Sequence, residues 1–372
     1  MQVVAYADDL LLIAEGKSRV EIEQKGTDWM GIVREWGMNV GVGVSKGKTV
    51  TMLLKGSMAA SRRPCVRMNG KLIRYSECVK YLGVSVSERM NFEMHFERMK
   101  IKITNVVGQM RRVLKSEWGM RKRAVRIVYK DLFAACVMYG SSVWCESMRS
   151  KYARDSMNKC QRIVLYACLN VCKTVSTDAM QVLMGALPWD LECVRNGLRR
   201  MIVNEWSICE NELVNVDELT GRSVEERVKF VDERAYARWQ TRWNESVNGR
   251  VTSEYIKNVR FVEQNAWFDP SVYACFLLTG HGSMNAFLYE RNLCESEICV
   301  CGAAKEDWRH VLFDCSMYEE LRDLGGCDIS VSEDGRVNVE RVLECKETYE
   351  CFCKYALNVF VRRRMNVRCM VS

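Results

Sequence analysis

Two groups of side chains in this sequence have the types and spacing that metal-ion chemistry requires. The first is a pair of aspartates, Asp8 and Asp9, which lies between two short apolar runs in the segment VVAYADDLLLIAEG. Carboxylate oxygens are preferred ligands of hard cations such as Mg²⁺, and two such ions about 4 Å apart are the usual arrangement for nucleotidyl transfer. Aspartate is also common in turns for structural reasons. The pair alone therefore leaves a structural and a catalytic interpretation open.

The second group contains three cysteines and one histidine with the spacing C-x-C-x8-H-x4-C: Cys299, Cys301, His310 and Cys315. Three thiolates and one imidazole suit tetrahedral Zn²⁺. The chain has 19 cysteines, so some close pairs arise by chance. Cys294 or Cys327 could replace one of the four. The spacing favours a zinc site without fixing its ligands.

The apolar runs around the aspartates predict the element that holds them. Residues 3–7 and 10–13 have the length and composition of two short strands, which gives a β-hairpin with Asp8 and Asp9 at its tip. An amphipathic helix is expected over residues 17–36. Asn69-Gly70 predicts a second hairpin turn.

Further along the chain the pattern changes from strands to helices. Strands are expected over residues 49–54 and 79–86, and the second of these is interrupted by Gly83. From residue 91 the apolar period is helical to about residue 173, and again over 176–208 and 217–245. A strand-rich beginning followed by a long helical region predicts an α+β fold.

Charge is concentrated in one part of the sequence. The net charge is +8, yet residues 98–130 contain eleven Lys or Arg and one acid, so the remainder is slightly acidic. This basic segment interleaves with an apolar period, so one face can pack while the other contacts phosphates. A solvated helix face is the alternative. The candidate phosphate contacts are Arg111, Arg112, Arg121, Lys122 and Arg123, with a second basic run at Arg362, Arg363 and Arg364.

Composition and length indicate the cellular compartment and the number of domains. The 372 residues are 48% hydrophobic, enough for about two or three domains with real cores. No stretch approaches the roughly 20 apolar residues of a transmembrane helix, and the N-terminus lacks the pattern of a signal peptide. We therefore expect an intracellular protein with no membrane partner, whose cysteines are mostly reduced.

Several motifs, taken in order, resemble a known family. They are AYADD, GKTVTMLL, VKYLGVSVSERMNFEMH, STDAMQVLMGALPWDLE, LTGHGSMNAFLYERNL and CVCGAAKEDWRHVLFDC. The first three resemble the second half of the palm of a reverse transcriptase from non-LTR, LINE-type retrotransposons. The full set resembles the Pol polyprotein of the arthropod type I elements that insert into ribosomal RNA genes.

This resemblance implies roles for particular residues in the palm. Asp8 corresponds to a carboxylate that binds catalytic Mg²⁺, with Asp9 in a lesser role. Lys48 corresponds to a lysine that assists the leaving pyrophosphate, although a solvent-facing lysine at a strand entry explains it equally well. Tyr81 and Gly83 belong to a segment similar to the primer-grip hairpin, where Gly83 permits close backbone approach and Tyr81 can simply pack in the core.

The resemblance also implies a division of the chain and a set of partners. Residues 1–89 are expected to form the C-terminal half of the palm, 90–175 a helical thumb, 176–289 a helical linker region, 290–325 a CCHC-type zinc knuckle and 326–372 a tail. The expected partners are an RNA template, a DNA primer or target, and the RNA–DNA hybrid, with dNTP as substrate of the full-length parent. The thumb would follow the sugar–phosphate backbone without reading sequence, and the site of action would be nuclear.

In the family, a second essential aspartate, the fingers and an endonuclease lie upstream of these motifs. We therefore expect the 372 residues to be a fragment of an RNA-directed DNA polymerase that is inactive by itself, with Met1 inside a truncated reading frame. The alternative is a non-catalytic nucleic-acid-binding remnant of a decayed element, formed by the thumb and the zinc knuckle.

Overall fold

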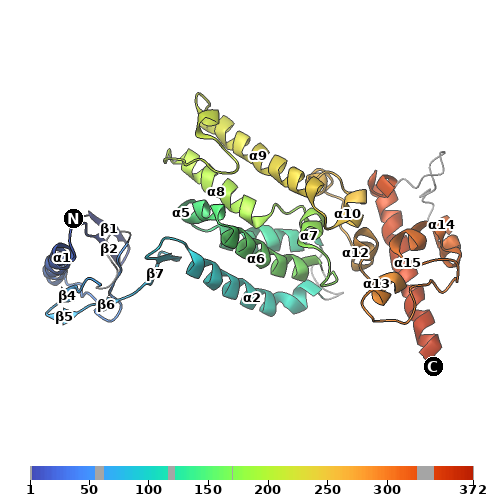
Figure 1. The fold of residues 1–372 in the computed structure, drawn as a ribbon, viewed down its shortest axis with the longest axis horizontal. Coiled ribbons are helices and arrows are strands. Elements are labelled where there is room, and N and C mark those ends of the chain that lie inside the picture. The colour runs from blue at the N-terminus through green and yellow to red at the C-terminus, as the bar shows by residue number, and fades with distance from the viewer. Residues whose placement is uncertain (1, 55–62, 116–121, 170, 325–338, 372) are drawn as a thin grey trace. The chain divides into compact units, whose positions relative to one another are not determined.

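A computed structural model describes residues 2–54, 63–115, 122–169, 171–324 and 339–371. Side chains are not described for residues 111–115, 122–123, 323–324 and 364–371. The chain divides into two compact units, Met1–Arg98 and Met99–Ser372 (Figure 1). Small sheets occur in the first and helices make up the second, so the predicted α+β class is confirmed.

The first unit is built from short two-stranded sheets and one long helix. Its elements are β1 (Gln2–Tyr6), β2 (Asp9–Ile13), α1 (Arg19–Asn39), β3 (Val50–Thr51), β4 (Arg67–Met68), β5 (Lys71–Leu72), β6 (Arg74–Tyr75), β7 (Cys78–Tyr81) and β8 (Val84–Ser87). Among the described residues, β1-β2, β4-β5 and β7-β8 form antiparallel hairpins, and β3 pairs with β6 in parallel. The predicted turn at Asn69-Gly70 is confirmed, and both residues have the positive φ angles that a tight two-residue hairpin turn requires.

Helix α1 holds this unit together. It begins after Ser18, whose Oγ accepts a hydrogen bond of 3.2 Å from the N–H of Glu21 and so caps the helix. Its buried face contributes to a small core of four residues: Met30, Val66, Met68 and Ile73. The helix expected over residues 17–36 is thus confirmed with slightly shifted ends. The strand expected over 49–54 is shorter, because only Val50–Thr51 finds a partner strand.

The second unit is almost entirely helical, and its first helix begins at Glu93, so the start of that helix, with His95, belongs to the first unit. Its elements are α2 (Glu93–Lys115), α3 (Lys122–Ile127), the π-helix η1 (Val128–Ala134), α4 (Ala135–Met138), α5 (Ser141–Trp144), η2 (Cys145–Arg149), α6 (Lys151–Leu169), α7 (Thr177–Met184), α8 (Trp189–Val203), η3 (Val216–Leu219), α9 (Val224–Glu245), α10 (Arg250–Tyr255), α11 (Phe261–Gln264), α12 (Val272–Thr279), α13 (Asn285–Tyr289), η4 (His310–Asp314), η5 (Ser316–Tyr318), α14 (Glu319–Leu324), η6 (Val339–Leu343) and α15 (Lys346–Val371).

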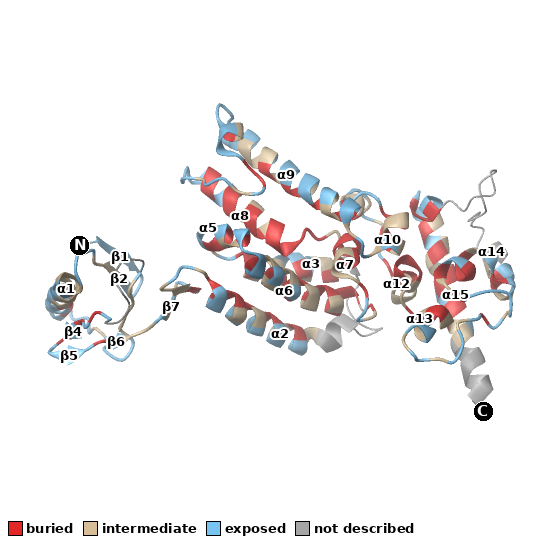
Figure 2. Ribbon diagram, in the orientation of Figure 1, coloured by how far each residue is buried: buried red, intermediate tan, exposed pale blue. Residues whose placement is uncertain are grey.

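The core of this unit lies between α5, α6, α7 and α8 (Figure 2). Its large side chains have essentially no exposed surface: Trp144, Leu165, Met180, Leu183 and Trp189. Gly197 lets α8 approach η2 closely, because a Cβ at this position would lie 2.5 Å from Sγ of Cys145. A larger residue there would force the two elements apart.

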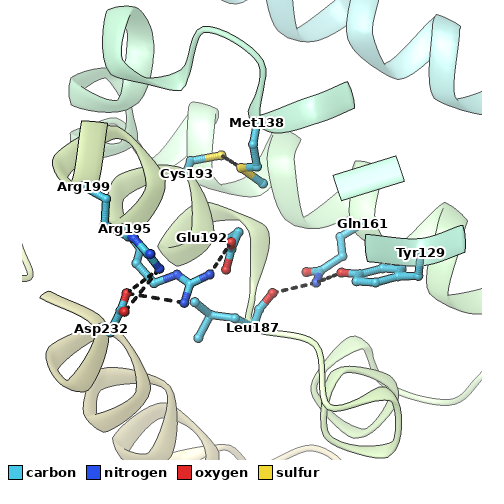
Figure 3. Close-up of polar contacts among 9 residues, drawn as sticks. All are labelled: Tyr129, Met138, Gln161, Leu187, Glu192, Cys193, Arg195, Arg199 and Asp232. Atoms are coloured by element: carbon cyan, nitrogen blue, oxygen red, sulfur yellow. Dashed lines mark hydrogen bonds and ion pairs between the residues drawn. The ribbon is translucent and has the colours of Figure 1, made fainter. Parts of the chain in front are cut away.

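Helices α8 and α9 run side by side (Figure 1) and are joined by half-buried ion pairs. Arg195 of α8 contacts Glu192 at 2.7 Å on its own helix and Asp232 of α9 at 3.5 Å. Arg199 lies 3.2 Å from the same Asp232 carboxylate. Figure 3 shows that both guanidinium groups converge on Asp232, which fixes the register of the two helices.

Aromatic contacts attach the long C-terminal helix α15 to α10 and α12. The rings of Phe360 and Phe276 lie edge to face with centroids 5.1 Å apart, and Phe352 lies 6.3 Å from Tyr255. The edge-to-face pair adds directional stabilisation to the burial of apolar surface. Within the described ranges, no helix is both long enough and apolar enough to cross a membrane.

Candidate functional site

The four predicted zinc ligands come together in one cluster. The sulfur atoms of Cys299 and Cys315 lie 3.6 Å apart, Sγ of Cys301 lies 3.3 Å from Nε2 of His310, and all four ligand atoms are within 4.8 Å of one another. Around a tetrahedral Zn²⁺ with ligand distances of about 2.0–2.3 Å, two sulfurs lie about 3.8 Å apart and a sulfur and a nitrogen about 3.6 Å apart. The donor set and its spacing therefore fit one zinc ion.

A tight turn supplies the first two ligands. The backbone N–H of Gly302 donates to the carbonyl of Cys299 at 2.8 Å, and the N–H of Cys299 donates to the carbonyl of Ala304 at 2.9 Å. An isolated β-bridge between Ile298 and Lys305 closes the base of this turn. The backbone thus brings Cys299 and Cys301, which are separated by one residue, to the same side of the turn.

The short π-helix η4 and the residue that follows it supply the other two predicted ligands. Its first residue, His310, donates its backbone N–H to Oδ1 of Asp307 at 2.9 Å, which caps the start of the turn. At its end the N–H of Cys315 donates to the carbonyl of His310 at 2.8 Å. The five-residue separation places both side chains at one side of a single wide turn.

Burial controls the protonation of the thiols in the metal-free cluster. It raises the pKa of Cys299 to about 12 and also raises the pKa of Cys315. The backbone N–H of Ala303, 3.5 Å from Sγ of Cys301, lowers the pKa of Cys301. At neutral pH the two buried thiols of the metal-free cluster therefore keep their protons.

The alternative ligands that the sequence left open have different outcomes. The thiol of Cys294 is directed to backbone carbonyls, at 3.4 Å from that of Asn285 and 3.2 Å from that of Ser296, and Cys294 is not part of the cluster. Cys327 lies outside the described residues. Among the described cysteines the geometry favours the original set of four.

The hairpin β1-β2 places its aspartates differently from the prediction. Tyr6 pairs with Asp9, so the turn consists of Ala7 and Asp8, and Asp9 is the first residue of β2. The expectation that both carboxylates stand at the tip was wrong for Asp9, because the strand pairing continues one residue further than the apolar run. Ala7 has a φ of +51°, an uncommon conformation for a residue with a side chain. Both aspartates are exposed.

The other residues that were expected in the palm lie in or beside other turns of the first unit. Lys48 is exposed and lies in a turn. Its backbone N–H donates to the carbonyl of Ser45 at 3.3 Å. Tyr81 ends β7, and its buried hydroxyl has no hydrogen-bond partner among the described residues. Gly83 has a φ of +88° and follows Leu82 at +45°, so its role in the structure is to form the turn of β7-β8. Within the described part of this unit no hydrogen bond or ion pair joins Asp8, Lys48 and Tyr81.

The candidate phosphate contacts of the basic segment lie beyond what can be described. Arg121 is outside the described residues, and the same holds for the side chains of four others: Arg111, Arg112, Lys122 and Arg123. Arg126, a described member of the segment, has a structural role, since its Nη2 donates to the carbonyl of Phe268 at 2.6 Å and burial lowers its pKa.

Two residues beside the cluster were not singled out by sequence reasoning in this role. Glu306 is completely buried and forms an ion pair with Arg363 of α15. The second basic run is therefore not uniformly available to phosphates, since Arg363 is engaged internally while Arg362 is exposed. The side chain of Arg364 is outside the described residues. No local pattern identifies the pair, because 57 residues separate its members.

A hollow of about 270 Å³ adjoins the same loop, between α12, α13 and the segment that leads to His310. Its cations are already paired: Lys305 lies 3.0 Å from Glu297 and 3.6 Å from Glu290, and Arg291 lies 3.5 Å from Glu290. This surface therefore offers no unbalanced positive charge to a phosphate.

The chain combines a small α+β unit that carries a carboxylate turn with a helical unit that carries a Cys₃His cluster. Over 368 residues this chain is 44% identical to the "Retrovirus-related Pol polyprotein from type-1 retrotransposable element R1" of Bradysia coprophila. The match covers 99% of this chain and 37% of that protein. Over 382 residues it is 42% identical to the "R1 2" Pol polyprotein of Nasonia vitripennis, covering 100% of this chain and 93% of that protein. The chain belongs to the family of R1 retrotransposon Pol polyproteins.

More distant similarity agrees with this family. Over 142 residues, 38% of this chain and 15% of the relative, it is 22% identical to the "RNA-directed DNA polymerase from mobile element jockey" of Drosophila melanogaster. No family model matches the chain, and no solved structure matches it. The chain is thus a retrotransposon protein related to reverse transcriptases, and it spans little more than a third of the length of the Bradysia relative.

Proposed function

We propose that this chain contributes the second half of the palm, the thumb and a zinc-binding region to an R1 reverse transcriptase. The whole protein would copy element RNA into DNA from the end of a nicked target, with an endonuclease elsewhere in the polyprotein. The observation that carries this proposal is the hairpin turn at Asp8. It holds a carboxylate, unpaired by any cation in the described structure, at the end of a two-stranded element.

The geometry of this turn supports a metal-binding role for Asp8. Its carboxylate is exposed and follows Ala7, whose positive φ is the kind of backbone strain that functional sites tend to contain. Mg²⁺ prefers one or two carboxylates together with substrate phosphates. In this role Asp8 would bind the ion, Asp9 would lie beside it, and Lys48 would assist the leaving pyrophosphate.

The surface of the first unit supports a palm that is completed by additional strands. The apolar side chains of β1 are exposed, at 45% for Val3, 47% for Val4 and 64% for Tyr6. Trp36 of α1 is 52% exposed. Isolated two-stranded hairpins are only marginally stable in water, so a further partner for this apolar surface would stabilise the unit.

The polymerase proposal is tested in an R1 polyprotein that contains this chain. We expect Asp8→Ala to reduce dNTP incorporation on a primed RNA template with Mg²⁺ by about a hundredfold or more. Asp28→Ala, which removes an exposed carboxylate from α1 of the same unit, serves as the matched control and should retain activity. Full activity of Asp8→Ala would refute the assignment. The 372 residues alone should not incorporate dNTP, because one carboxylate hairpin cannot hold both metal ions.

We also propose that the Cys/His cluster binds one Zn²⁺. In the same proposal, the thumb and the region around the cluster hold the RNA template, the DNA primer and their hybrid, and the protein acts in the nucleus. Metal analysis should find about one zinc per chain, lost in Cys301→Ser and in His310→Ala. Cys294→Ser is the matched control, because Cys294 is adjacent but bound to backbone carbonyls. Absence of zinc from the wild-type chain would leave the four residues as ordinary core.

A further inference from the structure

Glu306 carries a carboxylate with no access to solvent. It lies in the loop between Cys301 and His310 and is 0% exposed. Its Oε2 accepts a hydrogen bond of 2.7 Å from the backbone N–H of Asn285, and its Oε1 lies 3.9 Å from Sγ of Cys299. A buried carboxylate is unfavourable unless it is paired, so its partner is essential to this part of the fold.

That partner is Arg363 of α15, whose side chain is only 12% exposed. The guanidinium forms an ion pair with Glu306, and its Nη2 donates to Oδ1 of Asn285 at 2.6 Å. The planar arrangement of donors in arginine suits two acceptors at once, which a lysine does not reproduce. Burial lowers the pKa of Arg363, and the nearby sulfurs of Cys299 and Cys294 oppose that shift.

The charge of a metal-loaded cluster explains why a cation belongs at this position. Three thiolates and a neutral imidazole around Zn²⁺ carry a single net negative charge, and Glu306 adds another beside Cys299. Without Arg363, two like charges would lie together away from water, which is strongly unfavourable. Arg363 is thus placed to stabilise the thiolate form of the cluster.

Helix α15 makes a second contact beside the cluster. The buried hydroxyl of Tyr355 donates to the carbonyl of Val311, which lies in the turn that begins at His310. Tyr355 and Arg363 are about two helical turns apart on α15. The helix is therefore bonded to both chain segments that supply the ligands, one through each residue.

We propose that Glu306 and Arg363 are positioning residues of the Cys/His cluster, and that metal in the cluster holds α15 in its docked position. This inference rests on the proposed zinc site. The ion fixes the two ligand segments relative to each other, and each segment holds α15 by one of the two bonds. Mutation of residues that hydrogen-bond to metal ligands commonly lowers metal affinity by about 10- to 100-fold.

The wild-type chain provides the first test. Hydrogen exchange of residues 346–363 is measured with one equivalent of zinc and after removal of zinc by a chelator. We expect exchange in this range to accelerate at least about tenfold on chelation. Residues 224–245 of α9 are the internal reference and should not change. Unchanged exchange of residues 346–363 would overturn the coupling, whatever the behaviour of any variant.

Variants test the residues themselves. Zinc affinity is measured by competition with a chromophoric chelator for Arg363→Ala, Arg363→Lys and Arg362→Ala. Arg362 is the adjacent control, an exposed arginine of the same helix that lies 3.9 Å from Glu320. We expect Arg363→Ala to weaken zinc binding by about 10- to 100-fold while one zinc still binds at saturation, Arg363→Lys to recover part of the loss, and Arg362→Ala to change little.

The outcomes separate this inference from the zinc site on which it rests. If the wild-type chain binds no zinc, both fail. If it binds zinc but Arg363→Ala has the affinity of Arg362→Ala, the zinc site stands and the positioning role is wrong. If Arg363→Ala does not fold, the double variant Glu306→Gln/Arg363→Gln replaces it, since it removes both buried charges together. Wild-type zinc affinity in that double variant would equally refute the role.

Discussion

The side-chain amide of Gln161 donates from Nε2 to the hydroxyl of Tyr129 at 2.8 Å, within the core of the helical unit (Figure 3). The same Nε2 donates to the carbonyl of Leu187 at 2.9 Å. Its Oε1 accepts from Nε2 of Gln181 at 2.7 Å and from the N–H of Trp189 at 3.0 Å. One residue of α6 thereby satisfies polar groups from η1, from α7 and from the turn that begins α8.

We expect Gln161→Leu to destabilise this unit by about 3 kcal/mol or more, because it leaves four buried polar groups without their partner. Urea unfolding of the full chain measures the change. Gln109→Leu is the matched control, since Gln109 is exposed on α2 and should change stability by less than about 0.5 kcal/mol. Equal stability of the two variants would show that the network contributes nothing to stability.

Zinc affinity is expected to rise with pH. Burial raises the pKa values of Cys299 and Cys315, so both thiols are protonated in the metal-free chain at neutral pH and must lose those protons on binding. Release of at least these two protons makes affinity increase by at least about a hundredfold per pH unit between pH 6 and 8. Competition titrations at several pH values measure the slope. A pH-independent affinity would mean that the thiols do not bind the ion as thiolates.

His95 should remain neutral well below the usual pKa of histidine. It is 8% exposed and its Nδ1 accepts a hydrogen bond of 3.3 Å from the N–H of Ser85; burial, with Arg98 adding to it, lowers its pKa to about 4. Neutral His95 contributes its full stabilisation to the folded unit above pH 6.5, the ordinary pKa of histidine. This stabilisation is lost as the pH falls toward 4, the pKa of His95 in the folded chain. By pH 5 the first unit should lose about 2 kcal/mol.

The chain has three histidines, so NMR can follow the His95 ring directly. Hydrogen exchange of the β8 amides reports the stability of the unit over the same pH range. His95→Asn keeps an acceptor for Ser85 but no titrating group, and its stability should not fall between pH 7 and 5 through this site. A ring that titrates near 6.5 would contradict the prediction.

The basic segment should bind a duplex backbone without sequence preference. If its side chains contact phosphates, the triple variant Arg121→Ala, Lys122→Ala and Arg123→Ala should reduce the magnitude of the log–log salt slope for an RNA–DNA hybrid by about one to three units, because fewer counterions are released. Binding titrations at several salt concentrations measure the slope, and zinc content should be unchanged.

A second triple variant controls for net charge. It removes three exposed cations outside the basic segment and the expected thumb: Arg200→Ala, Lys229→Ala and Arg238→Ala. We expect its salt slope to equal that of the wild type. If the two triple variants lower the slope equally, the basic segment is a solvated helix surface and phosphate contacts lie elsewhere.

Some features of this protein follow from sequence alone, because they depend on residues close together in the chain. Asn69-Gly70 predicted a hairpin turn since only a few residue types accept two positive φ angles in succession. The helix that begins after Ser18 followed from its apolar period. The spacing of His310 and Cys315 likewise anticipated two ligands on one turn. In each case local backbone preference is sufficient.

Other features required the tertiary structure, because they depend on partners that are distant in the sequence. The strand expected over residues 49–54 shrank to Val50–Thr51, since a strand exists only where another strand pairs with it. Arg363 reads as one of three surface arginines until Glu306 is brought beside it, 57 residues away. Because Glu306 is buried away from solvent, Arg363 is required as its counterion and is not simply a solvated surface charge. Local preferences encode turns and periods, whereas the environment of a charge is decided only when the chain has folded around it.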